Sequence, residues 1–277
     1  MKRLLPLLAV AALVAALAAC GGGSSSTTTT TSTQAAAAPV MHPGKLVVAF
    51  GDPAPGFAQG TVRGNKITNP KGYEVDLAKA VAARLHLTPV WMYSPWTSLF
   101  APGTKKFDIS FQEATITSQR KQTVDFTKTY LNANQGVLLS KTAPTPHSLA
   151  DLKKLQTCAQ ADTTGLQYIT DQLKPDKRPL TYPTTTAAYE AVTVGQCQAF
   201  ILDVPLVLLQ KKQTPSRFGA VAGQIVTNEQ YGAVLQKHSK LTPIVDGILT
   251  KLTTNGTIGR LQKRWFNVDF AAIPQLH

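Results

Sequence analysis

Cysteines, clustered histidines and acidic residues are all scarce in this chain. Three cysteines in 277 residues are too few for a disulfide-dense miniprotein, and the five histidines are scattered, so no metal site is predicted. Asp and Glu number 15 against 28 Lys and Arg, which excludes an acidic disordered chain and leaves a formal net charge of +13. Hydrophobic residues make up 43% of the chain, so most of it should fold around a core, and their distribution does not fit a polytopic membrane protein.

The N-terminus carries a hydrophobic run, Leu4–Ala19, behind a short basic head. The run is shorter than the roughly 20 residues that a transmembrane helix needs and is typical of a secretory signal peptide. Its end, L-A-A-C, resembles the bacterial lipobox, whose cysteine is lipidated and becomes the first residue of the mature protein. We predict that residues 1–20 are a lipoprotein signal peptide and that Cys20 is the lipidation site. An ordinary signal peptide with a chance cysteine is the alternative.

Residues 21–41 form a nearly chargeless stretch of Gly, Ser, Thr and Ala, which is typical of a flexible linker. The folded part, from residue 42, is then expected outside the cytoplasmic membrane, anchored to the bacterial cell membrane through lipid. Secretion argues against nucleic acid as a partner, and no dense run of Lys and Arg with interleaved aromatics is present. The spread-out positive charge suits an anionic membrane or cell-wall neighbourhood, or has no function.

Short apolar runs alternate with helical periodicity along the folded part. The strand predicted at Lys45–Phe50 leads into a Gly/Pro/Asn-rich loop up to Gly72, followed by helical spacing over 75–85. The pattern restarts near Ser148 and includes a strand that ends at Asp203. This alternation predicts an α/β fold with a mainly parallel sheet, built from two units, in which the chain returns to the first unit.

Five short motifs follow one another in a characteristic order. Residues 72–78 read G-Y-E-V-D-L-A, and residues 115–127 contain T-I-T-S-Q-R followed by V-D-F-T. The other three are the L-A-D-L and T-T-G pair, the G-Q-C-Q-A-F-I-L-D stretch ending at Asp203, and N-G-T-I with R-W-F near the C-terminus. In this order they resemble the extracytoplasmic amino-acid-binding proteins of ABC importers, the family 3 solute-binding proteins.

The resemblance implies a two-lobed periplasmic-binding-protein fold of type II, with the ligand cleft between the lobes. Lobe 1 would take residues 42–136 and 232–277, and lobe 2 residues 137–231, with crossings near 136–139 and 231–234. It implies a monomer without cofactor or catalytic activity. The protein would capture a polar amino acid and deliver it to an ABC permease and its ATPase. The alternatives are a ligand-sensing surface lipoprotein and an enzyme resembling cyclohexadienyl dehydratase; an S-x-x-K match at Ser118 is set aside because no S-D-N or K-T-G follows.

The resemblance also assigns the groups that hold the ends of an amino acid. Arg120 matches the arginine that clamps the carboxylate, since its planar fork can form a bidentate pair. Thr164 would add hydroxyl and backbone N–H donors, in a turn that also holds Gln160 and Thr163. Asp203 matches the aspartate that takes the ammonium group, helped by the hydroxyl of Thr115. The competing readings are a surface arginine for Arg120 and a helix N-cap for Asp203.

The remaining candidates would form the side-chain pocket: Asp52, Phe57, Trp96, Gln112 and Glu113. The family often carries a stacking aromatic earlier in this loop; here either Phe57 replaces it or the pocket lacks one wall. Trp96 either packs on ligand or belongs to the core. Glu113 is unusual, because an ionised carboxylate in a closing cleft needs a partner. We hypothesise that Glu113, with Asp52, pairs with a cationic ligand side chain; the alternative is that Glu113 bonds to the other lobe and never meets ligand.

Cys158 and Cys197 remain after the lipidation site, each at the start of a predicted strand of lobe 2. A disulfide can persist outside the cytoplasm, and these two strands could be neighbours. We predict a Cys158–Cys197 disulfide, with two buried free thiols as the alternative.

Overall fold

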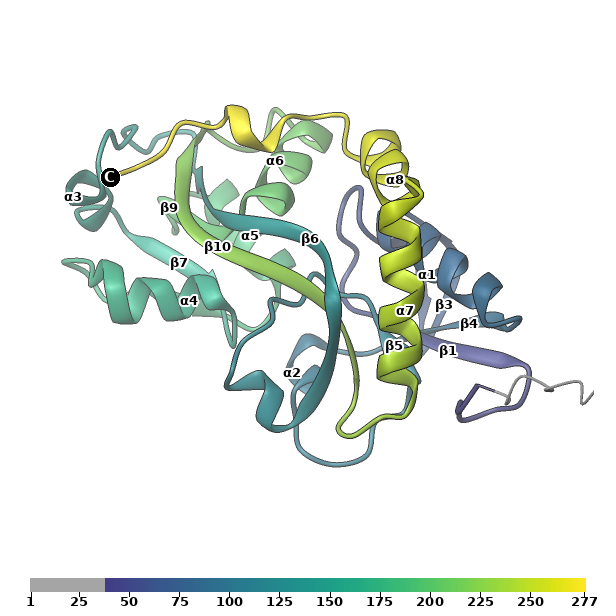
Figure 1. The fold of residues 1–277 in the computed structure, drawn as a ribbon. Coiled ribbons are helices and arrows are strands. Elements are labelled where there is room, and N and C mark those ends of the chain that lie inside the picture. The colour runs from purple at the N-terminus through teal and green to yellow at the C-terminus, as the bar shows by residue number, and fades with distance from the viewer. Residues whose placement is uncertain (1–37) are drawn as a thin grey trace, which may run out of the picture. The chain divides into compact units, whose positions relative to one another are not determined.

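The computed structural model describes residues 38–277, so the predicted signal peptide, Cys20 and most of the predicted linker lie outside the described residues. A ten-stranded sheet in the order β2-β3-β4-β1-β5-β10-β6-β9-β7-β8 organises this part (Figure 1). Its strands are β1 (Lys45–Phe50), β2 (Gln59–Arg63), β3 (Lys66–Lys71), β4 (Thr88–Tyr93), β5 (Ile109–Ser110), β6 (Val124–Leu139), β7 (Thr157–Gln160), β8 (Leu180–Tyr182), β9 (Ala199–Asp203) and β10 (Val221–Gln236).

Helices alternate with these strands as expected for an α/β fold. The α-helices are α1 (Tyr73–Arg84), α2 (Trp96–Leu99), α3 (Leu149–Lys153), α4 (Thr164–Tyr168), α5 (Thr185–Thr193), α6 (Val204–Gln213), α7 (Leu241–Thr254) and α8 (Thr257–Trp265). The other helical segments are the 3-10 helices η1 (Arg120–Gln122) and η3 (Phe270–Ala272) and the π-helix η2 (Ile169–Leu173). Among residues 38–277 no helix has both the length and the apolar character needed to cross a membrane.

Two halves of the sheet define the lobes. In lobe 1, which comprises β1–β5 with α1, α2, α7 and α8, strand β1 pairs in parallel with β4 and β5. In lobe 2, which comprises β7–β9 with α3–α6, strand β7 pairs in parallel with β8 and β9. Parallel strands joined through helices are buried on both faces, which explains the continuous apolar runs in β1 and β9.

The long antiparallel strands β6 and β10 belong to both lobes and run side by side (Figure 1). At one end Val234 of β10 pairs with Ser110 of β5, and at the other Gln135 of β6 pairs with Asp203 of β9. The ladder between β6 and β10 is irregular from Ile225 to Glu229. We call residues 131–134 and 226–231 the crossing. Strand β6 pairs with β9 of lobe 2 from Gln135 on, slightly earlier than the crossing predicted near residues 136–139.

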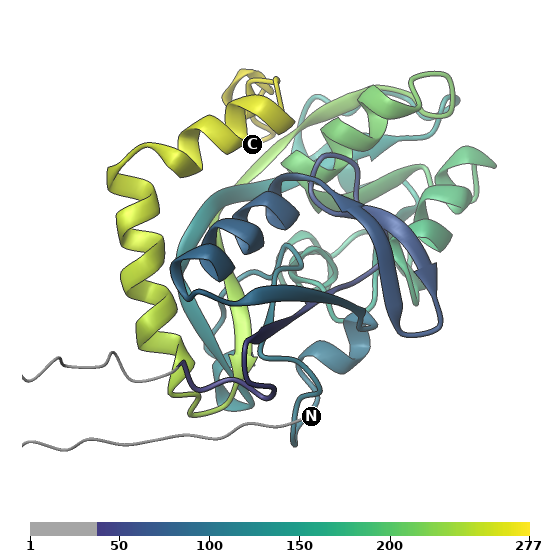
Figure 2. The same cartoon turned by 90° about the vertical axis from the view of Figure 1, so that its right-hand side faces the viewer.

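A β-hairpin occupies part of the stretch predicted as a loop before Gly72. Strands β2 and β3 pair antiparallel through a two-residue turn, Gly64-Asn65, and form an edge of the sheet (blue in Figure 2). Gly64 has φ 58°, a value that a tight hairpin turn requires and that glycine adopts without strain. The strands are largely exposed and β3 contains Pro70, so they lack the apolar alternation by which strands are recognised.

The C-terminal tail, residues 273–277, lies on lobe 2, which corrects its predicted place in lobe 1. Leu276 donates its N–H to the carbonyl of Gln224 at 2.9 Å, and its side chain is buried in the cluster that contains Val137 and Ile225. Strand β5 covers the outer edge of β10 only near Val234, so the lobe 2 half of that edge needs another cover. The tail supplies it, since an uncovered strand edge leaves backbone groups unpaired.

Substituting Leu276 with alanine should lower the free energy of unfolding by about 2 kcal/mol, the lower end of the range for buried leucines, because the residue lies near the surface. At roughly 2–4 °C per kcal/mol for a chain of this size, the melting temperature should fall by several degrees. Gln275→Ala, at the neighbouring exposed position, is the matched control. Equal melting temperatures for both variants would show that the tail does not hold the edge of β10.

Candidate functional site

Two small adjoining cavities, each about 50 Å³, lie between the lobes at the carboxyl ends of strands from both. In open α/β sheets ligands bind outside the carboxyl ends of the strands, because loops and helix starts converge there. We call the two cavities the cleft pocket. All the predicted ligand-binding residues except Phe57 line it, namely Asp52, Trp96, Gln112, Glu113, Thr115, Arg120, Gln160, Thr163, Thr164 and Asp203.

Arg120 is buried and held in one orientation rather than exposed at the surface. Its Nη1 donates to the carbonyl of Thr115 at 2.8 Å, and its Nη2 donates across to lobe 2, to the carbonyl of Asp162 at 2.9 Å. The guanidinium also lies over the rings of Phe100, at 4.2 Å, and Trp96, at 5.1 Å. Burial lowers its pKa to about 10, so it stays charged at neutral pH, and a guanidinium has five N–H donors, more than these two bonds use.

Asp203 provides the opposite charge on the lobe 2 side of the cleft pocket. Its Oδ2 accepts from the Tyr231 hydroxyl at 2.5 Å, and its Oδ1 accepts from the side-chain amide of Gln135. It stands at the start of α6 but makes no capping bond there with its side chain. Burial has the larger effect and the charge of Glu229 the next largest, and together they raise the pKa of Asp203 to about 7. The carboxylate is therefore positioned for a cation such as a ligand ammonium group.

Glu113 lines the cleft pocket next to a second buried acid, Glu74. The N–H of Glu113 donates to Oε1 of Glu74 at 2.9 Å, and Glu74 also accepts from the hydroxyl of Tyr130. To reach Glu74, Glu113 adopts φ 48°, which is uncommon for a residue other than glycine. Its buried Oε1 has no hydrogen-bond partner among residues 38–277. Burial, reinforced by the charge of Glu74, raises the pKa of Glu113 well above its usual range.

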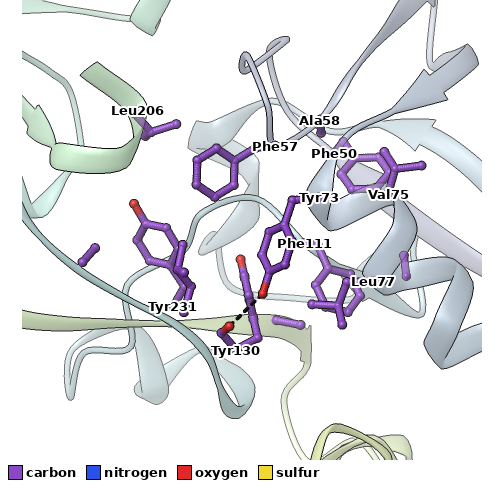
Figure 3. Close-up of a cluster of buried hydrophobic side chains, with 14 of the residues drawn as sticks. Phe50, Phe57, Ala58, Tyr73, Val75, Leu77, Phe111, Tyr130, Leu206 and Tyr231 are labelled. Carbon is purple, nitrogen blue, oxygen red and sulfur yellow. Dashed lines mark hydrogen bonds between the residues drawn. The ribbon is translucent and has the colours of Figure 1, made fainter. Parts of the chain in front are cut away.

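Phe57 belongs to the core, so its predicted role in stacking on ligand is corrected. Its side chain is fully buried, with its ring centroid 4.8 Å from that of Phe266. The ring of Tyr73 is 6.2 Å away, and Figure 3 shows it in the same cluster of buried side chains. Tyr231, whose hydroxyl reaches Asp203, packs on the same ring at 6.3 Å. Phe57 thus supports the cleft from behind.

Trp96 is a pocket residue, in contrast to Phe57. It lines both cavities from the start of α2, and its indole N–H donates to the carbonyl of Asp162 at 3.3 Å. The same carbonyl accepts from Arg120, so two lobe 1 side chains meet one lobe 2 backbone group. Outside this contact a larger pocket of about 630 Å³, lined by Phe100, Arg120 and Asp171 among others, opens at the mouth of the cleft.

Thr163 has a structural role in addition to its place in the lining. Its hydroxyl donates to the carbonyl of Gln160 at 2.7 Å and accepts from the N–H of Leu166, which caps α4. Because both bonds lie within this turn, they fix the position of Thr164 at the first turn of the helix. Thr164 is the residue of this turn whose hydroxyl reaches toward the crossing.

Several cleft residues were not found from the sequence. Thr185, Tyr189, Leu202 and Leu206 line the cleft pocket from lobe 2. Leu202 could have been found, since it directly precedes Asp203 in a predicted strand. Glu229, which bonds to Thr115 and Thr164, comes from the crossing, and no motif or charge spacing indicates it.

Cys158 and Cys197 are bonded in the structure, with their Cα atoms 5.8 Å apart. The bond joins β7 to the loop between α5 and β9. Because β7 leads to Thr164 and β9 ends at Asp203, the disulfide lies between the two segments that carry the lobe 2 half of the site.

The chain is similar to known proteins over most of its folded part. The family model of the bacterial extracellular solute-binding proteins, family 3, matches residues 46–268. The chain is 28% identical over 212 residues to the probable amino-acid-binding protein YxeM of Bacillus subtilis (strain 168), covering 74% of this chain and 79% of that protein.

Two solved structures share the fold at similar identity. The arginine-, lysine-, histidine-binding protein ArtJ from the thermophilic bacterium Geobacillus stearothermophilus superposes with a TM-score of 0.70 at 27% identity, covering 81% of this chain and 96% of that chain. The ancestral amino acid-binding protein AncCDT-1, a precursor of cyclohexadienyl dehydratase, gives a TM-score of 0.70 at 28% identity, covering 80% and 95%.

Proposed function

The chain belongs to the bacterial extracellular solute-binding proteins, family 3, and from this premise we propose that it captures an amino acid with a cationic side chain and passes it to an ABC permease. Membership of the family and the type II periplasmic-binding-protein fold confirm the resemblance and the fold class expected from the sequence. The proposal places the folded part outside the cytoplasmic membrane, anchored through Cys20. Support for the anchor comes from the lipobox-like sequence that ends at this cysteine.

The charges of the cleft pocket complement the two ends of an α-amino acid. Arg120 presents a guanidinium from lobe 1, and Asp203 presents a carboxylate from lobe 2. A ligand that bonds to both would link the lobes, so its binding free energy favours the closed arrangement. Capture would therefore produce the closed form that a permease can distinguish from an empty, open one.

The observation that carries the cationic preference is the buried carboxyl of Glu113. Oε1 of Glu113 is buried and has no hydrogen-bond partner among the described residues, and burial raises the pKa of this carboxyl well above its usual range, so its charged form needs a cation beside it. Asp52 lines the same cavity, so two acidic side chains face the space beyond Arg120 and Asp203. A guanidinium or ammonium group on the ligand would supply the missing partner. ArtJ, a protein named for binding arginine, lysine and histidine, has the same fold.

The substitution Glu113→Gln tests this preference. It removes the charge and keeps the shape, so we expect affinity for L-arginine and L-lysine to fall by about tenfold or more, as for loss of one charge-assisted hydrogen bond. Affinity for L-glutamine should stay within about twofold. Isothermal titration calorimetry on residues 38–277 measures both, and Glu190→Gln, an exposed acid paired with Arg217, is the control. An equal loss for all three amino acids would refute the preference.

We propose binding without turnover, although AncCDT-1 is described as a precursor of a dehydratase. The relatives described above are named as binding proteins, which supports this choice. Incubation with a cyclohexadienyl acid, followed by chromatography, is the direct check. Product formation that Glu113→Gln abolishes would favour the enzyme instead.

A further inference from the structure

Glu229 links the two lobes through the hydroxyls of the cleft. Its Oε2 accepts from the Thr115 hydroxyl at 2.7 Å and from the Thr164 hydroxyl at 2.6 Å. Thr115 belongs to lobe 1 and Thr164 to lobe 2, whereas Glu229 lies in the crossing, where the ladder between β6 and β10 is irregular. One carboxylate oxygen therefore joins both sides of the cleft.

The direction of these bonds determines what the hydroxyls can offer a ligand. An ionised carboxylate only accepts hydrogen bonds, and a threonine hydroxyl has a single proton. Both protons are therefore directed to Glu229. The oxygens of Thr115 and Thr164 line the cleft pocket, where Thr164 accepts from the side-chain amide of Gln135 at 3.3 Å and keeps one further lone pair. Lone pairs accept from an ammonium group and repel a carboxylate. In this network the Thr164 hydroxyl would accept from a ligand, in contrast to the donor role that the resemblance implies for it.

We infer that Glu229 is a positioning residue for ligand recognition, one that orients the two threonine hydroxyls to accept from the ligand's ammonium group and bonds the lobes together when the cleft is closed. The ammonium end then meets three acceptors, namely Asp203, Thr115 and Thr164, while the carboxylate end depends on Arg120. The inference rests on the proposed capture of an α-amino acid and is independent of the ligand's side chain.

A second contact couples Glu229 to Asp203. The side-chain amide of Gln135 lies within hydrogen-bond distance of three acceptors: Oε1 of Glu229 at 2.9 Å, the Thr164 hydroxyl at 3.3 Å and Oδ1 of Asp203. The two acids therefore share one donor group. The charge of Glu229 adds to burial in raising the pKa of Asp203 to about 7. Four other ionisable groups interact electrostatically with Asp203: Tyr231 of β10, Arg120 of η1, Glu113 after β5 and Tyr189 of α5.

These contacts predict how ligand affinity depends on pH. Asp203 must be ionised to bind an ammonium group, so affinity should fall as the pH drops through about 7. Removing the charge at position 229 lowers the pKa of Asp203, which moves this fall toward lower pH. A residue that only supported the fold would weaken binding equally at every pH.

The test compares Glu229→Gln with Glu229→Asp and with the control Glu190→Gln. The glutamine amide can donate to a threonine hydroxyl and reverse its direction, whereas the aspartate keeps the charge with a shorter reach. Titrations at pH 8 and pH 5.5 use L-arginine, L-glutamine and the α-hydroxy acid analogue of L-arginine, which lacks the ammonium group. We expect the wild type to favour L-arginine over the hydroxy acid, and Glu229→Gln to reduce this ratio by about tenfold.

A ligand-free measurement separates this inference from the proposed function. Carbon-13 NMR titration of the Asp203 carboxyl should give a pKa near 7 in the wild type and in Glu229→Asp, and a lower one in Glu229→Gln. If the wild type binds neither L-arginine nor L-glutamine, the proposed function fails, and this titration still tests the link between Glu229 and Asp203. An unchanged Asp203 titration, or an unchanged ratio of amino acid to hydroxy acid in Glu229→Gln, would overturn the inference.

Discussion

Substituting Arg120 with alanine should abolish amino-acid binding while leaving the protein folded. Removing one partner of a buried charge pair costs about 2–5 kcal/mol, which corresponds to a loss of affinity of about 30-fold to several thousand-fold. Arg120 is only 8% exposed and its guanidinium lies over the rings of Phe100 and Trp96, so the alanine variant loses a charge that is held in one place. Calorimetric titration with L-arginine and with L-glutamine measures the loss, which should be similar for both because the carboxylate is common to them.

Arg120→Lys is the matched variant for this experiment. Lysine keeps the charge but offers a point contact in place of the planar fork, so part of the affinity should return. Circular dichroism and the melting temperature report on folding, which is needed because Arg120 also bonds to the carbonyls of Thr115 and Asp162. Affinity within a few-fold of wild type for the alanine variant would refute the role of Arg120 in holding the carboxylate.

The positions of residues at strand ends could be predicted because the sequence marks them directly. Asp203 ends an apolar run and Asp52 follows one, and parallel strands bring such ends to one edge of a sheet. The order of motifs then predicted the two-lobed fold, with Arg120 and Thr164 on opposite sides of the cleft. The structure brings these residues together around the cleft pocket.

Features that depend on contacts between distant segments were missed. An aromatic residue in a loop near the cleft can stack on ligand or enter the core, and the composition around Phe57 is the same in both cases. The chain path decides between them: Gly56 adopts φ 76° and places the Phe57 ring against Phe266, which lies far away in sequence. Glu229 was missed for a similar reason, because its role arises from hydroxyls of two separate lobes.

Reducing the Cys158–Cys197 disulfide should lower the free energy of unfolding by about 4 kcal/mol, the chain-entropy value for a loop of this length. The cysteines are 39 residues apart in sequence, so breaking the bond frees a long loop in the unfolded chain. At roughly 2–4 °C per kcal/mol, the melting temperature should fall by about 8–16 °C. Urea denaturation of the wild type with and without reductant measures this difference in free energy. Reduction breaks the S–S bond and leaves every other side chain of the protein unchanged.

The double variant Cys158→Ala with Cys197→Ala is the control, because reductant should not change its stability further. It should also be less stable than the oxidised wild type by a similar amount or more, since both cysteines are fully buried and lose packing. The bond anchors β7 to the loop before β9, so ligand binding by the folded, reduced protein should weaken only if these strands shift Thr164 or Asp203. Identical denaturation midpoints with and without reductant, together with an unchanged protein mass, would contradict the bond and favour two buried thiols.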